Sequence, residues 1–480
     1  MVEVALIRPG PIVGQMVHPY LNRRAGREEV VYDHPLLEPI LKRTLGVPLF
    51  QEQLLRMAMV VAGFTGGQAE DLRRAMGFKR SEKRMQQLEG LLRGGMAKNG
   101  ITGAAADRIV LSITSFALYG FPESHAASFA LLAYASAYFK AHYPAAFYAA
   151  LLNNQPMGFY HPATLVKDAQ RHGVRFTPVD VQVSEWDCTV EPDGAIRLGL
   201  RYVRGLREEM GQAIAKAEGT RQKAEIDSRC PKCGCDDPSM IEVVSLASSP
   251  KPQAFCNVCS HEWAFEVRPT QRYRTVDELI RRTGIRRDEV ATLAEVGALN
   301  SLGHDRRSAL WQIERAVRPA GELLEEASSL KPQAPSPLPE MSISERLIAD
   351  YAGTGLTVGP HPMTFRRHDL SMRGVLPAID LPKARAGRRV RTAGMVITRQ
   401  RPGTAKGFVF LTLEDETGIA NIIIRPDLYA TDRLTIVESS FLLVEGVLQN
   451  QDGVTSIKAE RVSKLDGLSD QAAFDSHDFH

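Results

Sequence analysis

The chain has 480 residues, of which 44% are hydrophobic and 24% are charged, and its formal net charge is only +3. This is ordinary globular composition with enough length for about three domains, and six cysteines in so long a chain exclude a disulfide scaffold. No segment reaches about 18 uncharged apolar residues and the first residues do not resemble a secretory signal, so we expect a cytoplasmic protein with no membrane partner.

Charge is unevenly distributed along the chain. Residues 73–84 hold six basic residues against Glu82, residues 383–408 hold eight Lys or Arg and no acid, and residues 465–480 hold four Asp and no Lys or Arg. A single charge run is usually a solvated face. Two basic tracts in separate domains favour a polyanionic partner such as nucleic acid.

Residues 1 to about 170 are predicted to be helical. Five segments place apolar residues three and four apart with Gly near their ends: residues 38–46, 50–64, 68–78, 83–100 and 106–120. Short β-type runs split by Gly, Pro and Asp then indicate a small mixed module over residues 164–200.

The segment YGFPESHAASFALLAYASAYFKAHYPAAF, residues 119–147, predicts a long buried helix. Ser124 is its expected N-cap, and the helix should run to His142, with Pro144 opening the next helix. His125 then lies on the first turn, where the helix dipole disfavours imidazolium and free N–H groups attract anions. A histidine that packs at a helix start without any ligand is the alternative.

Beyond Arg201 the sequence predicts short helices joined by Gly-containing hairpins at residues 203–206, 283–285 and 296–302. Helix-hairpin-helix units of this kind expose backbone N–H groups that bind DNA phosphate without reading bases. Arg204 and Gly205 are the DNA-binding candidates of the first hairpin. Plain helical packing is the alternative.

Five of the six cysteines fall within residues 230–259, where two CxxC pairs are separated by 22 residues. Such spacing is typical of a closed tetrahedral zinc site, for which we assign Cys230, Cys233, Cys256 and Cys259 as ligands of a structural ion. Cys235 and His261 are weaker substitutes, and a redox pair is the competing interpretation. Cys188 stands apart as a small core residue.

Residues 318–342 are rich in Pro, Ala and Ser and are predicted to be a linker. Five β-runs follow, over residues 388–402, 407–418, 419–428, 439–453 and 454–465, which predicts a small OB-type barrel. Because the first run carries the acid-free basic tract, a groove for single-stranded nucleic acid is expected there. The candidate residues are Arg388, Arg389, Arg391, Arg399, Arg401 and Lys406. A purely structural or protein-binding barrel is the alternative.

Several long motifs resemble the fingers region of bacterial C-family DNA polymerases. They are ALIRPGP (5–11), GVPLFQEQ (46–53), AGFTGGQAEDLRRAMG (62–77), YGFPESHAASFALLAY (119–134) and KAHYPAAF (140–147). The resemblance covers nearly the whole chain apart from the zinc insertion. Three features resemble the error-prone branch of this family rather than the replicative α subunit. They are the segment NNQPMGFYHPATLVKDAQRHGV, the ending DFH, and the lack of a QxxLF-like clamp motif.

The resemblance implies a DNA-directed DNA polymerase of translesion synthesis and damage-induced mutagenesis. It implies that Arg73 and Arg74 hold the triphosphate of the incoming nucleotide, with Lys79 and Arg80 as weaker candidates, and guanidinium suits this task because it grips phosphate through a planar fork. Tyr119 and His125 match positions that line the sugar and base pocket. His125 is implied to be the steric gate against a ribose 2′-hydroxyl.

The fold class expected from these observations is multidomain α+β. The implied parts are the end of the palm and start of the fingers (1–60), helical fingers (61–163), the mixed module (164–200), the hairpin region (201–317) with a zinc ribbon inserted at about 221–268, the linker (318–342), a connector (343–382), the OB-fold (383–465) and an acidic tail (466–480).

Polymerisation needs two Mg²⁺ ions held by carboxylates, which the family supplies from palm aspartates that we expect outside this chain. No acid here is therefore assigned as catalytic. The implied partners are primer-template DNA, dNTP, a separate palm chain, mutagenesis accessory proteins and the sliding clamp. A non-catalytic DNA-binding or scaffolding remnant, or a fragment of the replicative α subunit, remains the alternative.

Overall fold

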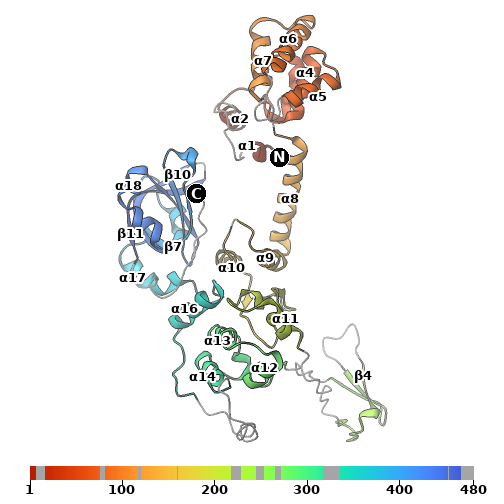
Figure 1. The fold of residues 1–480 in the computed structure, drawn as a ribbon, viewed down its shortest axis with the longest axis vertical. Coiled ribbons are helices and arrows are strands. Elements are labelled where there is room, and N and C mark those ends of the chain that lie inside the picture. The colour runs from red at the N-terminus through yellow and green to blue at the C-terminus, as the bar shows by residue number, and fades with distance from the viewer. Residues whose placement is uncertain are drawn as a thin grey trace. The chain divides into compact units, whose positions relative to one another are not determined.

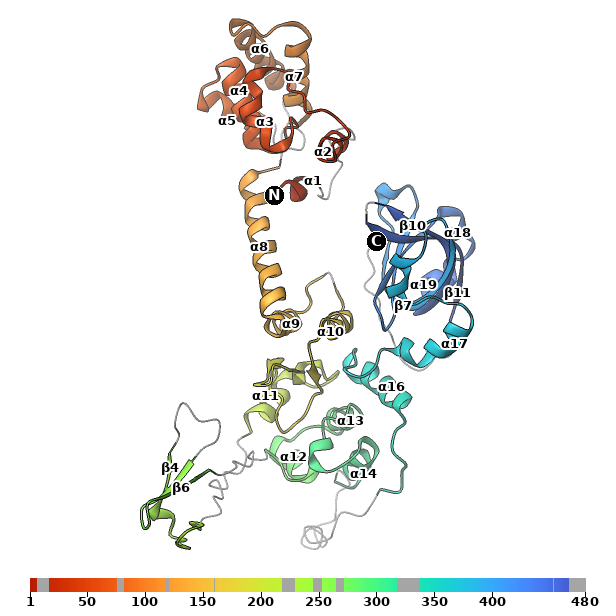
Figure 2. The ribbon, with the colours of Figure 1, turned by 180° about the vertical axis from the view of Figure 1, so that it is seen from behind.

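The computed structural model forms two compact units, Met1–His142 and Tyr143–His480 (Figures 1 and 2). It describes residues 1–6, 17–75, 82–116, 121–158, 160–217, 229–244, 253–264, 272–316, 336–451 and 453–465. None of the helices in these ranges is long and apolar enough to cross a membrane.

The first unit is helical, as the sequence predicts. Its elements are α1 (Val2–Leu6), α2 (Val17–Arg24), η1 (Pro35–Leu37), α3 (Glu38–Leu41), η2 (Lys42–Thr44), α4 (Gln51–Ala62), α5 (Gly66–Ala75), α6 (Glu82–Lys98), α7 (Gly103–Phe116) and α8 (Glu123–His142). Leu54, Met57 and Val61 repeat at helical spacing along α4 and are buried against apolar residues of α6 and α7.

Helix α8 differs from its prediction in two ways. It runs to His142, and Pro144 opens α9 (Pro144–Asn153) as expected, but it begins at Glu123, so Ser124 lies inside the first turn and is not the N-cap. Only Ala126 of its residues is buried, in a small cluster with residues of α1, α2 and the strand-like segment before α4. The expectation of a buried helix was wrong, because its packing partners within this unit reach only its first turns.

The second unit opens with a helical region. Its elements after α9 are α10 (Pro162–Arg171), β1 (Phe176–Thr177), β2 (Thr189–Val190), β3 (Ile196–Arg197), η3 (Leu200–Tyr202), α11 (Glu208–Lys216), α12 (Val276–Thr283), α13 (Arg287–Glu295), η5 (Asn300–Leu302) and α14 (Arg306–Ala316). Strand β3 pairs in parallel with β1 and antiparallel with β2. The predicted hairpins turn at Gly205, Gly284 and Gly297, whose φ angles of 80°, 65° and 83° favour glycine.

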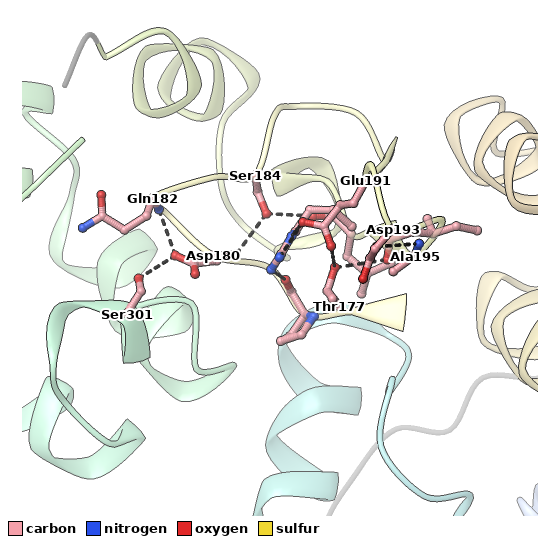
Figure 3. A network of polar contacts seen from close by, with 12 residues as sticks. Thr177, Asp180, Gln182, Ser184, Glu191, Asp193, Ala195 and Ser301 are labelled. Carbon is pink, nitrogen blue, oxygen red and sulfur yellow. Dashed lines mark hydrogen bonds and ion pairs between the residues drawn. The ribbon is translucent and has the colours of Figure 1, made fainter. Parts of the chain in front are cut away.

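A polar network holds the mixed module together and joins it to η5 (Figure 3). The carboxylate of Asp180 accepts hydrogen bonds from Ser301 Oγ at 2.6 Å and from the Gln182 backbone at 2.9 Å. Glu191 accepts from Thr177 Oγ1 at 3.0 Å and is paired with Arg197 at 2.7 Å. These carboxylates are therefore engaged in shaping loops and turns.

A buried carboxylate connects the first two hairpins. Glu289, on α13, is 2% exposed and accepts hydrogen bonds from the Arg207 backbone (3.0 Å), from both Arg207 Nε and Nη2 (2.9 and 3.0 Å) and from the Arg286 backbone (3.1 Å). These bonds, above all the one from the Arg207 guanidinium, lower the pKa of Glu289 to about 2.

A closed barrel follows, in the order β10-β11-β9-β8-β7, as the OB-type prediction requires. Its strands are β7 (Arg389–Gln400), β8 (Val409–Glu414), β9 (Ile419–Ile424), β10 (Phe441–Gln451) and β11 (Val454–Lys464). Helices α16 (Ile343–Thr354), η6 (Pro362–Arg366), α17 (Arg367–Met372) and η7 (Ala378–Lys383) precede it, η8 (Gly403–Ala405) follows β7, and α18 (Pro426–Thr431) and α19 (Arg433–Glu438) lie between β9 and β10.

The barrel is tied to the helical region through Glu414, a fully buried residue at the end of β8. Its Oε1 is paired with Arg171 of α10 at 2.7 Å. Lys167, also on α10, donates to the carbonyl of Gly359, and burial lowers its pKa to about 8. His361 faces the other oxygen of the carboxylate, with its Nε2 3.8 Å from Glu414 Oε2.

We predict that Glu289→Gln lowers the free energy of unfolding of the hairpin region by about 2 kcal/mol, because a buried charge-assisted network loses its charge. The folded-state pKa lies below the ordinary value of about 4.5, so this stabilisation is present above pH 4.5 and is lost as the pH falls toward 2. Urea unfolding followed by tryptophan fluorescence measures it, since Trp311 lies in this region and Trp186 packs against its apolar core.

Glu295→Gln is the matched control, because Glu295 is exposed on the same helix. It should change the unfolding free energy by less than about 0.5 kcal/mol. Equal losses for the two variants, or a loss for Glu289→Gln that does not shrink in acid, would contradict the assigned network.

Candidate nucleotide, DNA and metal sites

Four cysteines meet beside a small three-stranded sheet formed by β4 (Ile241–Val244), β5 (Gln253–Cys256) and β6 (His261–Ala264), with η4 (Pro238–Met240) before it. The Sγ atoms of Cys230, Cys233, Cys256 and Cys259 all lie within 4.8 Å of one another. The clustering predicted from the two CxxC pairs is confirmed.

The geometry of this cluster fits a tetrahedral zinc ion. Each CxxC pair sits in a turn that is closed by a backbone bond, Gly234 N to Cys230 O at 2.9 Å and Ser260 N to Cys256 O at 2.8 Å. The Sγ atoms of Cys230 and Cys259 are 3.5 Å apart, and those of Cys233 and Cys256 are 3.6 Å apart. Four sulfurs at the usual zinc distance would be about 3.8 Å apart, so little movement is needed.

The two substitutes for these ligands lie outside the cluster. Cys235 contributes its carbonyl, which accepts from the Cys230 backbone at 2.8 Å, and the ring of His261 stacks on Trp263 with centroids 6.0 Å apart. Cys188 is buried in the core of the second unit as expected, and burial raises the pKa of its thiol to about 11.

Arg73 and Arg74 lie in the last turn of α5, where both guanidinium groups are engaged by Glu70 one turn earlier. Arg73 donates to Glu70 through Nε and Nη2 at 2.9 and 2.7 Å, and Arg74 donates through Nε at 3.3 Å. The hydrogen bond from Arg73 is the main reason that the pKa of Glu70 is lowered to about 2. Both arginines are solvent-exposed, so an anion can compete with Glu70 for them.

Glu52 organises the start of α8, and it does so where Ser124 was expected to act. Its Oε2 accepts the backbone N–H of Glu123, the first residue of α8, at 2.8 Å. Glu123 is also paired with Arg43, and the backbone N–H of Gln51 donates to Phe121 O at 3.0 Å. A carboxylate at a helix start satisfies an orphan donor and complements the helix dipole.

The same carboxylate lies within electrostatic reach of Arg73, because its charge contributes to the raised pKa of that guanidinium. Arg73 and the first turn of α8 therefore share Glu52 as a neighbour. His125 lies on that turn as expected and is exposed, between the rings of Phe121 and Phe129 at centroid distances of 5.4 and 4.7 Å. Lys79, Arg80 and Tyr119, the other nucleotide-binding candidates, lie outside the described residues.

Gln53 fixes the position of Glu52. Its buried amide accepts from the backbone of Leu49 and Phe50 and donates to Ile40 O and Thr44 Oγ1, with all four distances between 2.9 and 3.1 Å. Neither Glu52 nor Gln53 was assigned a role from the sequence. The contacts of Glu52 span 71 residues, and no local pattern encodes them.

Arg204 and Gly205 form the exposed tip of the first hairpin. The Arg204 backbone N–H donates to Gly353 O at 2.7 Å, so the end of α16 supports this turn. The bonds from Arg207 to Glu289 hold its other side. A side chain at Gly205 would meet nothing within 4 Å of its Cβ, which leaves this face of the hairpin open.

The six basic candidates of the barrel do not form one group. Arg388, Arg389 and Arg391 lie at the start of β7, whereas the other three lie at its end or in the following loop. The two ends of this strand are roughly 36 Å apart along the chain. The sequence tract is continuous, but the surface that it forms is divided.

The basic residues at the end of β7 and in the following loop make different kinds of contact. Arg399 donates to the carbonyls of Ile436 and Ser439 at 2.8 and 2.7 Å, so it braces the entry to β10. The guanidinium of Arg401 lies over the ring of Tyr429, 4.9 Å from its centroid, and Lys406 is exposed in the same loop. Phe410 is 40% exposed on β8, which places an aromatic ring at this face.

Among the described residues, the four cysteines are the one group of His, Cys, Asp or Glu side chains arranged to hold a metal ion. The acids Asp180, Glu191 and Asp193 are close in sequence, but each accepts hydrogen bonds from different partners: Gln182 and Ser301, Thr177, and Ala195 respectively (Figure 3).

Three parts of the chain match protein-family descriptions. Residues 1–100 match the finger domain of the bacterial DNA polymerase III alpha subunit, residues 173–236 match a helix-hairpin-helix motif, and residues 390–465 match an OB-fold nucleic acid binding domain.

Curated relatives match along the full chain. An error-prone DNA polymerase of Anaeromyxobacter dehalogenans is 41% identical over 491 residues and covers 100% of this chain, and that of Alkalilimnicola ehrlichii is 41% identical with the same coverage. Error-prone DNA polymerase 3 of Agrobacterium fabrum is 41% identical and covers 97%. The chain spans 39%, 42% and 40% of these three relatives.

Several solved structures are similar to a small part of the chain. An asparaginyl-tRNA synthetase from Pyrococcus horikoshii covers 16% of this chain and 20% of its own length, with 25% identity and a TM-score of 0.15. A likeness of this size carries no functional argument.

We predict that the protein purified without chelator contains about one zinc ion per chain, because four thiolates already meet at near-tetrahedral spacing. Cys256→Ser should reduce the bound zinc severalfold, whereas Cys235→Ser, the matched control from the same segment, should retain it. Elemental analysis measures the content. Much less than one zinc in the unaltered chain, or an equal loss in both variants, would contradict the assignment.

Proposed function

We propose that this chain, which belongs to the error-prone branch of the bacterial C-family DNA polymerases, supplies the nucleotide-binding and DNA-binding parts of a DNA-directed DNA polymerase. The enzyme would act in translesion synthesis and damage-induced mutagenesis. The supporting observation is identity of about 41% to error-prone DNA polymerases along the full length of the chain. The chain spans about two fifths of the length of those relatives.

The nucleotide site that we propose uses Arg73 and Arg74 for the triphosphate, with Lys79 and Arg80 beside them. Two exposed guanidinium groups, already oriented by Glu70, offer the forked donors that phosphate oxygens require. Little free energy is needed to release them from Glu70, because exposed ion pairs contribute little to stability. His125 and Tyr119 would line the sugar and base, and the proximity of Glu52 to both Arg73 and α8 supports one shared site.

The DNA-binding surface that we propose lies in the second unit. Arg204 and Gly205 would approach the duplex backbone at the first hairpin tip, where both residues are exposed and the Gly205 side of the turn is open. The barrel would bind the single-stranded template, with Arg401 and Lys406 for the backbone and Phe410 as a stacking surface. Arg388, Arg389 and Arg391 would add charge at the other end of β7.

The catalytic Mg²⁺ ions would be held by palm aspartates in the part of the polymerase that this chain does not span. They would stabilise the attacking 3′-hydroxyl and the leaving pyrophosphate. This chain's own contribution would be to bind and orient the nucleotide and the template. The zinc ribbon would be structural. The palm part, mutagenesis accessory proteins and the sliding clamp would be its partners.

We predict that Arg73→Ala or Arg74→Ala weakens nucleotide use by about 2 kcal/mol, roughly thirtyfold in kcat/KM for dNTP, since each removes a charge-assisted phosphate contact. Steady-state primer extension is measured after the chain is combined with a palm-bearing part; the chain alone should bind primer-template without extending it. Arg93→Ala is the matched control, because Arg93 is an exposed, ion-paired helical arginine on α6. Robust extension by this chain alone would refute the proposal that catalysis needs the palm part. Unchanged kcat/KM for dNTP in both variants would refute triphosphate binding by Arg73 and Arg74.

We predict that His125→Ala relaxes discrimination against ribonucleotides by at least about tenfold, because a smaller side chain no longer crowds the 2′-hydroxyl. Single-nucleotide incorporation of dNTP and rNTP by the same combined enzyme gives the ratio. His142→Ala, at the other end of α8, should leave the ratio unaltered. A gate role for His125 fails if the sugar preference stays the same.

A further inference from the structure

A cleft of about 470 Å³ opens on the barrel at the start of β7. Four arginines and two glutamates line it: Arg373, Arg388, Arg389, Arg391, Glu445 and Glu460. Arg373 follows α17 and precedes the barrel, and it was not among the sequence candidates. We call this feature the arginine cleft.

The walls of the arginine cleft are fixed by backbone pairing. Arg389 and Arg391 alternate with buried Val390 on β7, so both face outward. The segment after α17 is held against β7 by a parallel bridge between Leu376 and Thr392, in which Leu376 N donates to Arg391 O at 2.8 Å. Arg373 is thereby placed beside the strand arginines.

The floor of the cleft contains a β-bulge. The register of β10 against β11 shifts between Glu445 and Gly446, and a side chain on Gly446 would lie 2.2 Å from Lys458 O. A bulge of this kind redirects a side chain on its strand. Here the extra residue lies on β11, because Glu445 pairs with Arg461 and Gly446 with Ala459, which leaves Glu460 between them. Glu460 is ion-paired with Arg389 at 3.0 Å, and Glu445 of β10 is ion-paired with Arg391 at 3.2 Å.

These pairs leave an excess of positive charge in the cleft. Four guanidinium groups face two carboxylates, and two of the four, Arg373 and Arg388, have no side-chain ion pair or hydrogen bond within the described part of the chain. The glutamates orient their own arginines, and the remaining N–H groups are available to a ligand with several acceptor oxygens.

We propose that the arginine cleft is a phosphate-binding site that holds adjacent phosphate groups, and that its ligand is the backbone of a DNA strand. Phosphate fits better than a carboxylate because one tetrahedral group offers acceptors to several guanidinium forks at once. The site is separate from the Arg401 and Lys406 face, since Arg391 and Arg399 are roughly 26 Å apart along β7. The choice of DNA as ligand rests on the proposed function.

The test compares the full chain with Arg388→Gln and with the double variant Arg373→Gln/Arg388→Gln. Arg433→Gln is the control of equal charge, because Arg433 is exposed on α19 outside the cleft. Fluorescence anisotropy with a labelled single-stranded oligonucleotide is recorded over a range of salt concentrations. Melting temperatures establish that each variant is folded.

We expect the double variant to bind DNA at least about tenfold more weakly than the unaltered chain. The slope of log K against log salt should fall by about 1.4, since each lost phosphate contact to a single strand removes about 0.7. Arg433→Gln should change the affinity less than Arg388→Gln does. If the unaltered chain binds DNA and the double variant keeps both its affinity and its slope, the cleft proposal is overturned while the proposed function stands.

A second experiment distinguishes failure of the phosphate-site proposal from failure of the proposed DNA-binding function. If the unaltered chain does not bind DNA, the proposed DNA-binding role fails, and calorimetric titration with inorganic pyrophosphate decides the cleft. If pyrophosphate gives binding heat with the unaltered chain but not with the double variant, the cleft is a phosphate site, and its ligand is a free phosphate compound rather than DNA. Absence of heat in both proteins overturns the phosphate site.

An acidic peptide is the competing occupant, and the chain's own residues 466–480, with four Asp and no Lys or Arg, supply the probe. A synthetic peptide of this sequence is titrated into the same proteins. Binding of the peptide that is lost in the double variant, with DNA and pyrophosphate binding unchanged, would overturn the phosphate proposal in favour of a peptide site.

Discussion

A buried ion pair between Glu414 at the end of β8 and Arg171 of α10 joins the barrel to the helical region, beside an apolar core that both parts share. A carboxylate with no exposure is destabilising unless its charge is matched and its oxygens are hydrogen-bonded. Arg171 meets one oxygen, while Glu414 Oε2 and His361 Nε2 have no hydrogen-bond partner within the described structure. A well-packed apolar contact would stabilise this junction as effectively. We infer that the charge is retained because it permits one docking of the barrel on α10, which in turn fixes where the barrel's basic residues face.

At the start of α8, too, a carboxylate joins two segments that are distant in the sequence. Gln53 satisfies four backbone and side-chain partners within its own loop, and this rigid loop presents the carboxylate of Glu52 to the first N–H of α8. A serine cap would have satisfied that helix from within. Capping by a residue 71 positions away instead couples the orientation of α8 to α4, and so couples His125 to the region of Arg73.

Sequence patterns located most elements because they are local. Runs of β-type residues separated by turns predicted five strands, glycines predicted the hairpin turns, and two CxxC pairs predicted the cysteine cluster that the structure brings together. Contacts between distant residues were not accessible. Nothing near Glu289 indicates that Arg207 is its partner, and nothing near Ser124 indicates that Glu52 replaces it. Burial of α8 was predicted from its apolar composition, but burial depends on partners, and within this unit those partners reach only its first turns.

The basic tract of residues 383–408 illustrates why composition alone does not define a surface. In an extended strand each residue advances roughly 3.3 Å, so a tract of continuous charge reaches opposite ends of a small barrel. Closure of the barrel then assigns each end different neighbours: glutamates from β10 and β11 at the start of β7, and Tyr429 with backbone carbonyls at its end. Arginines that are equivalent in the sequence thus become a brace, a stacking group or a cleft lining. Arg373, from outside the tract, joins the cleft because a backbone bridge places it there.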